Sequence, residues 1–200
     1  TAFKIASDGS LSTPTAGTSN VRFGANAGNS IVSGSTYNVL VGDEAGTAIT
    51  TGDANVAVGF SALATEDGHG FNTAVGHETL KVLNAGADAY NTAVGFRAGL
   101  SVTTGVNNTL IGGLSGDANT TGDDNTAVGF NALSANTTAS NNTAVGKAAL
   151  KVNTTGAANT AIGATSLDAN TTGGENTAVG FKSLGENTTG SANTVLGYAA

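Results

Sequence analysis

A five-residue pattern, Asn-Thr-Ala-Val-Gly, recurs along almost the whole chain and sets the spacing of its apolar residues. There are eleven copies, and eight of the ten intervals between them are 17 residues long, the other two being 18 and 19. A fixed period of this kind is typical of repeat proteins, in which every copy folds the same way. The first residues of the copies are Asn20, Asn38, Asn55, Asn72, Asn91, Asn108, Asn125, Asn142, Asn159, Asn176 and Asn193.

Positions within a copy are counted from this Asn as position one. Position four is always apolar and position five is always Gly. A short run of Val and Thr closed by Gly is typical of a β-strand, and Gly recurs too often for a helix. We therefore predict an all-β fold, a parallel β-solenoid (a β-roll or β-helix) of about eleven 17-residue coils. At about 4.8 Å per coil, the rod would be roughly 50 Å long.

The apolar position four is expected to face the coil interior, and alternation along the strand then turns position two inward as well. Position nine is Leu in six copies and Gly in four, which suggests a second inner strand. The Asn at position one is expected to form a side-chain ladder between coils. The Gly at position five suits a positive φ or a close approach at a corner.

Position three faces outward under the same alternation, yet it is small and apolar. An apolar outer face is normally covered, and we expect another copy of the chain to cover this one. The alternative is that Ala is merely tolerated on an exposed face. The predicted oligomer interface comprises Ala57, Ala74, Ala93, Leu110, Ala127, Ala144, Ala161 and Ala178.

Position six varies most between copies, so it is where a ligand-binding role would lie. Phe60, Phe96, Phe130 and Phe181 occupy it in four copies and could stack on sugar rings. The simpler interpretation, which we favour, is that these rings pack against neighbouring turns.

The composition narrows the range of partners. A net charge of −7 argues against nucleic acid, which would require a basic face. No run of 18 apolar residues is present, so we predict no membrane insertion. The chain begins without Met and stops part-way through the eleventh copy, and we expect it to be a piece of a longer protein.

Two segments differ in pattern. Residues 1–19 precede the repeats and suggest an extended piece with a turn at Asp8-Gly9, followed by a connector around Pro14. Residues 20–200 form the repeat solenoid. Two stretches, Ile31 to Tyr37 and Lys81 to Tyr90, carry the extra residues of the longer copies and are predicted to be turns, because a strand could not absorb them.

Catalytic chemistry is not indicated by the sequence. His69 and His77 lie near Glu66, Asp67 and Glu78, but their spacing matches no zinc pattern, and solvated turn residues are the favoured interpretation. No nucleophile-base arrangement or phosphate loop stands out. We expect no enzyme activity, no cofactor and no metal.

The repeats NTAVGFNALSANTTAS and NTAVGFKSLGENTTGS resemble the Asn-Thr-Ala-(Val/Leu)-Gly repeats of phage tail-fibre proteins. They are similar, more loosely, to the head repeats of YadA-like trimeric autotransporter adhesins, whose coil is shorter. The resemblance covers Asn20 to Ala200 and implies a homotrimer with a fibrous, adhesive role, located on a virion tail or an extracellular surface. It also implies a glycan or protein of the host-cell surface as a partner.

The leading interpretation is therefore a structural fibre segment that acts as a rigid trimeric shaft and binds a host receptor. A second hypothesis is an ice- or polymer-binding solenoid that uses stacked Thr pairs. A third is a self-assembling extracellular filament, since an uncapped solenoid presents open edges. The Thr pairs are Thr120-Thr121, Thr137-Thr138, Thr154-Thr155, Thr171-Thr172 and Thr188-Thr189.

Overall fold

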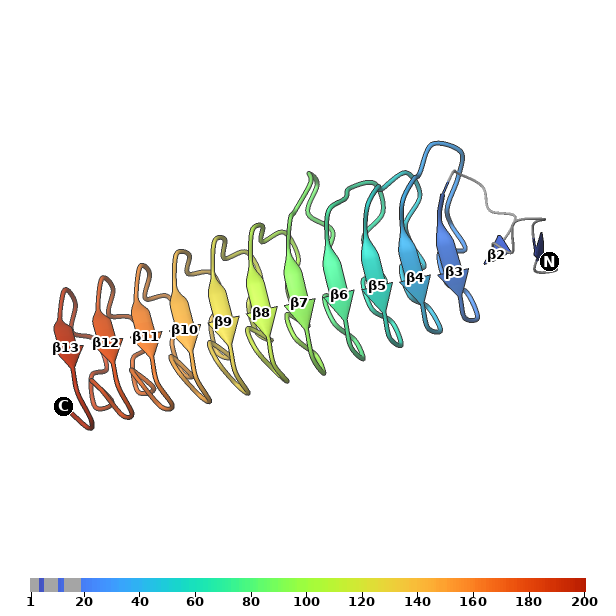
Figure 1. Ribbon diagram of the computed structural model, residues 1–200. Helices are drawn as coiled ribbons and strands as arrows, with labels where there is room; N and C mark the ends of the chain where they lie inside the picture. The colour runs from blue at the N-terminus through green and yellow to red at the C-terminus, as the bar shows by residue number, and fades with distance from the viewer. Residues whose placement is uncertain (1–3, 6–10, 13–18) are drawn as a thin grey trace.

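The computed structural model describes residues 4–5, 11–12 and 19–200 (Figure 1). Near the N-terminus, β1 (Lys4–Ile5) and β2 (Leu11–Ser12) pair in antiparallel orientation. The turn predicted at Asp8-Gly9 and the connector predicted around Pro14 lie outside the described residues.

The described repeats form a parallel β-solenoid of about ten turns, as predicted, with one three-residue strand in each coil. The strands lie side by side in sequence order in a single sheet (Figure 1). They are β3 (Val21–Phe23), β4 (Val39–Val41), β5 (Val56–Val58), β6 (Thr73–Val75), β7 (Thr92–Val94), β8 (Thr109–Ile111), β9 (Thr126–Val128), β10 (Thr143–Val145), β11 (Thr160–Ile162), β12 (Thr177–Val179) and β13 (Thr194–Leu196).

The coils stack in register, so each position meets the same position of the next coil. Between β9 and β10, for example, Thr126 pairs with Thr143 and Ala127 pairs with Ala144. The two stretches with extra residues fall between strands, and the longer connections project from the stack between β3 and β4 and between β6 and β7 (Figure 1). The insertions therefore leave the register of the sheet intact, as predicted.

The orientation predicted for the strands is wrong. Position three, expected to face outward, lines the coil interior, and Ala127 and Ala144 are fully buried within a single chain. Positions two and four, expected inside, face outward and are half-buried or exposed. The coil is narrow, so the strand contributes a small side chain to the core and turns its β-branched residues to the outer face of the sheet.

Most of the remaining core comes from the other sides of the coil. Leu133 and Leu150 at position nine are buried, but no strand forms there, so the predicted second inner strand is absent from the described residues. Where position three is a large Leu, position nine is Gly. A Cβ on Gly116 would lie 2.7 Å from the Cδ2 atom of Leu110, and a Cβ on Gly46 equally close to Leu40. Most coils thus carry one large Leu, either at position three or at position nine, while at Gly99 the space is filled by Leu80 and Leu110 of the neighbouring coils.

The Gly at position five combines both features expected of it. Its φ is positive, 137° at Gly129. A Cβ there would approach within 2.6 Å of the carbonyl oxygen of Gly146 in the next coil. Neighbouring coils therefore touch backbone to backbone at this corner, and only Gly fits both the conformation and the space.

Two ladders of Asn side chains run along the interior. At position one, the backbone N–H of Asn142 donates to Oδ1 of Asn125 over 3.0 Å. The Nδ2 group of Asn125 crosses the coil and donates to the carbonyl of Ala139 over 2.9 Å. This confirms the predicted ladder. The second ladder, at position twelve, was not predicted: Nδ2 of Asn153 donates to Oδ1 of Asn136 over 3.2 Å. The ladders satisfy buried amides that would otherwise destabilise the fold.

Candidate functional site

The four Phe residues proposed as ligand contacts lie on the surface at the corner after the strand. Phe60, Phe96, Phe130 and Phe181 are 42%, 50%, 52% and 43% exposed. Each occupies the same position of its coil, so the rings follow one line along the rod. The structure brings them to one edge of the solenoid without enclosing them in a groove.

Stacking between neighbouring coils decides which part of these rings is accessible. The ring centre of His77 lies 5.1 Å from that of Phe60 and 5.5 Å from that of Phe96. Phe181 and Tyr198 form another stacked pair, 5.3 Å apart. Rings in a stack cover each other's faces and present their edges to solvent. Phe130 differs, because Gly113 and Lys147 occupy position six in the adjacent coils and no aromatic ring stacks on it there.

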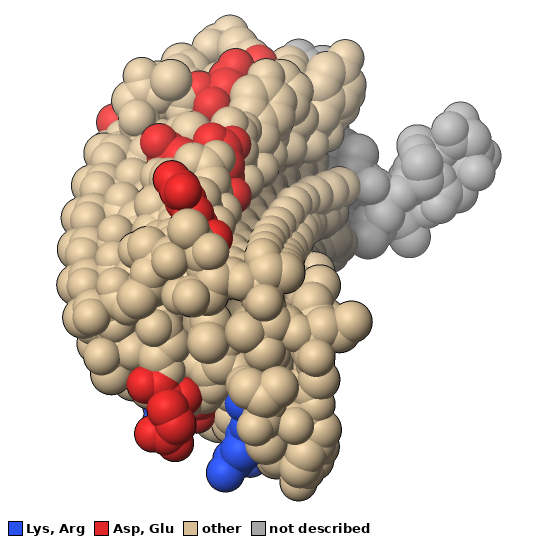
Figure 2. All heavy atoms as spheres, turned by 90° about the vertical axis from the view of Figure 1, so that its left-hand side faces the viewer, with Lys and Arg blue, Asp and Glu red and all other residues tan. Residues whose placement is uncertain are grey.

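A charged cluster borders this row at Phe96. Glu78 accepts hydrogen bonds from Nζ of Lys81 over 2.6 Å and from Nε of Arg97 over 2.8 Å. These two bonds lower the pKa of the Glu78 carboxyl below its ordinary range. The Arg97 guanidinium also lies 5.1 Å from the ring centre of Phe96. Figure 2 views the molecule from the C-terminal side. Its charged residues gather in a few zones, and most of the surface in this view is uncharged.

The predicted oligomer interface at position three is also wrong in its placement. Every residue of that set is fully buried inside its own chain, so none can contact a second copy. The outward face of the sheet consists instead of positions two and four. Position two is Val in β3 to β5 and Thr in the other eight strands, and position four is apolar throughout.

The hydroxyl groups at position two are unused within the fold. Among the described residues, none of the outward Thr hydroxyls has a hydrogen-bond partner in the chain. The sheet therefore presents a row of free hydroxyls beside a row of Val, Ile and Leu. The sequence does not reveal this surface, because the apolar character of position four predicts that positions two and four face the coil interior.

The Thr pairs are only partly available for binding. The Oγ1 group of Thr120 donates to the carbonyl of Thr137 over 2.9 Å, and that of Thr154 donates to Thr171 over 3.0 Å. The first Thr of these pairs thus joins successive coils. The second, as at Thr121 and Thr138, is exposed.

Glu66 lies in the interior of the third coil at position twelve, where the neighbouring coils carry Ile49 and Leu83 and the sixth to tenth coils carry Asn. Its side chain is fully buried and its Oε1 lies 3.3 Å from Nδ1 of His69. It also accepts hydrogen bonds from the backbone N–H groups of His69 and Ala85. Burial is the main cause that raises the pKa of the Glu66 carboxyl, and these contacts oppose the shift.

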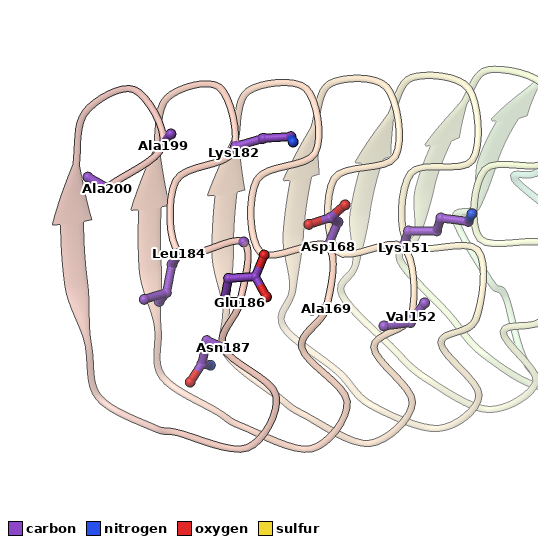
Figure 3. Close-up of a pocket in the computed structure, with 11 residues that line it drawn as sticks. Lys151, Val152, Asp168, Ala169, Lys182, Leu184, Glu186, Asn187, Ala199 and Ala200 are labelled. Atoms are coloured by element: carbon purple, nitrogen blue, oxygen red, sulfur yellow. The ribbon is translucent and has the colours of Figure 1, made fainter.

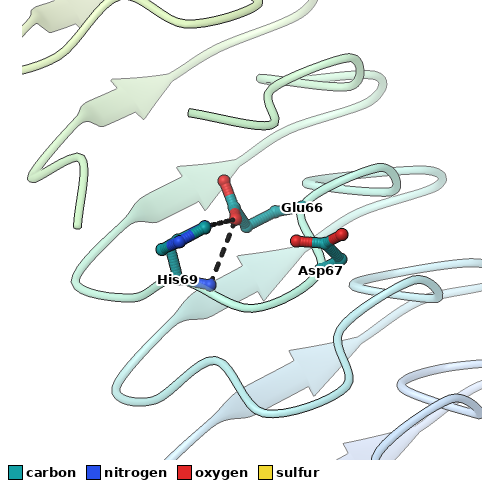
Figure 4. Close-up of side chains that lie close together, drawn as sticks. All are labelled: Glu66, Asp67 and His69. Carbon is teal, nitrogen blue, oxygen red and sulfur yellow. Dashed lines mark hydrogen bonds and ion pairs between the residues drawn. The ribbon is translucent and has the colours of Figure 1, made fainter. Parts of the chain in front are cut away.

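Asp67 completes a group in which ligand atoms of three residues lie within 4.8 Å of one another. In Figure 4 the marked interactions join Glu66 to His69 and leave Asp67 aside. Asp67 instead accepts a hydrogen bond from the N–H of Gly68. The contacts therefore join Glu66 to His69, while Asp67 lies on the surface.

A hollow lies at the C-terminal end of the stack, between successive coils (Figure 3). Its charged lining residues include Lys151, Asp168, Lys182 and Glu186. Burial is the main cause that raises the pKa of the Asp168 carboxyl. The hollow borders Ala200, the last residue of the sequence, so its outline depends on where the sequence stops and gives no basis for a ligand.

No protein-family model, curated protein or solved structure matches this chain. The described residues contain no helix long and apolar enough to cross a membrane.

Proposed function

We propose that this chain is a rigid shaft segment of a fibre on a virion tail or an extracellular surface, which holds receptor-binding groups away from its base. The carrying observation is the unbroken register of eleven strands along one axis. Two internal Asn ladders reinforce it. A rod in which every coil is hydrogen-bonded to the next resists bending, as a shaft must.

The adhesive part of this role belongs to the repeated exposed rings at position six. Phe130 has no aromatic neighbour stacked on it from the adjacent coils, and at 52% it is the most exposed of the four Phe rings. Repeating a weak contact along a rigid rod raises the overall affinity through effective concentration. A glycan or protein of a host-cell surface is the partner that this arrangement would serve.

Rigidity can be measured with two spin labels. The chain has no Cys, so Thr51→Cys and Thr189→Cys introduce unique exposed sites eight coils apart. Pulsed electron–electron double resonance should give a narrow distance distribution centred at about 40 Å. A broad distribution would rule out the shaft.

Receptor binding needs a separate readout. Beads displaying many copies of the chain are applied to an array of defined glycans. Replacing Phe60, Phe96, Phe130 and Phe181 with Ser should abolish any retention. The matched control carries four substitutions to Ser at the exposed Thr104, Thr121, Thr138 and Thr155. Retention equal in both variants would refute the role of the Phe row while leaving the shaft intact.

The free Thr hydroxyls on the outer face favour a second candidate function, binding to ice or to another ordered polymer. The stacked Thr pairs support it less, because the first Thr of four of the five pairs already donates its hydroxyl to the next coil. Thermal hysteresis in a cooled solution of the protein would support ice binding, and its absence would remove it.

A further inference from the structure

We infer that the outer face of the sheet is a pairing surface, on which a second copy of this chain packs face to face. The surface consists of positions two and four of β3 to β13 and is called the outer sheet face below. It goes beyond the proposed shaft role and does not depend on receptor binding. It also replaces position three, which is core, as the place of self-association.

The side chains of the outer sheet face are uncharged and more than half of them are apolar, which is typical of a surface that another molecule covers. Across all eleven strands it holds only Thr, Val, Ile, Leu and Phe, with no charged residue. Ile111 and Ile162, on interior strands, are 38% and 41% exposed. Monomeric proteins rarely expose a continuous apolar patch of more than a few hundred Å².

The area is sufficient for a pair. Eleven strands spaced by about 4.8 Å and three residues long give a face of about 50 by 10 Å, or about 500 Å² on each copy. Two copies would together cover about 1,000 Å², which reaches the lower range of specific interfaces. The exposed aromatic rings at position six border this face and would enlarge it.

The pattern of the two rows favours one orientation. A two-fold axis parallel to the rod places the Thr row of each copy opposite the Val and Ile row of the other. From β6 to β13 the Thr hydroxyls, which have no partner within the chain, would then be buried against methyl groups without an acceptor. An antiparallel pair centred on β8 instead sets Thr against Thr from β6 to β10, where the hydroxyls can hydrogen-bond across the interface, and sets the apolar row against the apolar row, so this orientation is favoured. Sheets packed in this way lie about 10 Å apart.

The first test is the mass in solution across a concentration series, measured by light scattering. The expected mass is twice 19.2 kDa. Val128→Lys, on the outer sheet face, should weaken dimerisation at least tenfold. Thr138→Lys lies in the same coil on another exposed side and should leave the mass unchanged. If V128K does not fold, as judged by circular dichroism, Thr160→Lys replaces it.

The orientation is tested by cross-linking single-Cys variants of a chain that has no Cys of its own. In the antiparallel pair centred on β8, Thr126→Cys in one copy lies opposite Thr92→Cys in the other, and a short bismaleimide should join them. In a parallel pair, Thr126→Cys would meet Val128→Cys instead.

The outcomes separate cleanly. A single-chain mass at all concentrations, a three-chain mass, or a two-chain mass that V128K and T160K leave unchanged would overturn the pairing. Preferred cross-linking between the Cys at 126 and 128 would overturn the antiparallel orientation. Failure of pairing would not disturb the spin-label distance within one chain, so the shaft is judged separately.

Discussion

At the scale of single residues, the corners of the coil force left-handed backbone on residues that do not favour it. Positions seven, nine and seventeen have positive φ in coil after coil, for example 57° at Asn131, 55° at Leu133 and 58° at Ala158. A non-Gly residue in this region costs about 1 to 2 kcal/mol. Leu133 offsets that cost because its side chain is buried in the core.

Two adjacent glycines allow a direct test of the corner at position five. Gly112 has φ of 130°, and a Cβ there would lie 2.6 Å from the carbonyl oxygen of Gly129, whereas the nearest atom to a Cβ on Gly113 is 3.5 Å away. Gly112→Ala should lower the free energy of unfolding by about 3 kcal/mol, since strain and a steric clash add. Gly113→Ala should cost less than about 1 kcal/mol. Equal effects in chemical denaturation would contradict the close-approach argument.

The buried Glu66 predicts a specific pH dependence. Its pKa is raised by burial in the folded chain, so the folded state holds the proton more tightly than the unfolded state. Its contribution to stability is therefore complete below the unfolded pKa and is lost as the pH rises through the folded pKa. Glu66→Gln should flatten this part of the stability curve and stabilise the chain at neutral pH.

Thermal unfolding of the wild type and Glu66→Gln at several pH values between 4 and 8 is the measurement. Glu66→Gln with Asp67→Asn as a matched control separates the buried carboxyl from its exposed neighbour. A pH profile that Asp67→Asn alters and Glu66→Gln leaves unchanged would contradict the assignment.

Sequence alone identified the period, the Gly corner and the Asn ladder at position one, because each recurs in every coil. It did not identify which side of the strand faces inward. Alternation of polar and apolar residues normally decides this, but here Ala127 inside and Val128 outside are both apolar. The left-handed backbone at Leu133 was equally hidden, since Leu has no preference for it and only closure of the coil imposes it.

At the scale of one coil, core volume is conserved by exchange between its sides. The sixth coil pairs a large Leu110 with Gly116, while the seventh pairs Ala127 with Leu133. Leu110 in the sixth coil and Leu133 in the seventh therefore fill the equivalent space of their own coils from opposite sides. This covariation was readable in the sequence, but its meaning required knowing that position three faces the core.

A double-mutant cycle in the sixth coil follows from this exchange. Leu110→Ala should cost about 2 to 5 kcal/mol by leaving a cavity. Gly116→Leu should also destabilise, because its side chain would collide with Leu110. Together the two changes copy the seventh coil and should be less harmful than either alone, with a coupling of at least about 2 kcal/mol. Additive effects in denaturant titrations would show that the sites do not share space.

At the scale of the whole molecule, stability is nearly one-dimensional, because each coil contacts mainly its neighbours. Removing residues 125–141 deletes one complete coil and joins Asp124 to Asn142, which preserves the register. We expect this variant to fold and the distance between labels at positions 51 and 189 to shorten by about 5 Å.

The control deletes one residue fewer, 127–142, and joins Thr126 to Thr143 inside the strand. Unlike the turns of the longer copies, a strand cannot absorb an extra residue, so the side chains after the junction exchange their inner and outer faces. This deletion should unfold part of the stack, seen as lost signal in circular dichroism. Normal folding of the control would mean that the register tolerates slippage.

The amide ladders also give the rod a direction. At position twelve, the Nδ2 groups of Asn136, Asn153 and Asn170 all donate to the preceding coil. The N–H groups at position one donate in the same sense. Aligned dipoles of this kind add along the axis. The ladder at position one spans every coil, so one end of the stack offers its donors and the other its acceptors, whereas the ladder at position twelve begins only at Asn119. A further coil can continue these ladders only if it points in the same direction along the axis. Solenoids of this kind can therefore join end to end only head to tail.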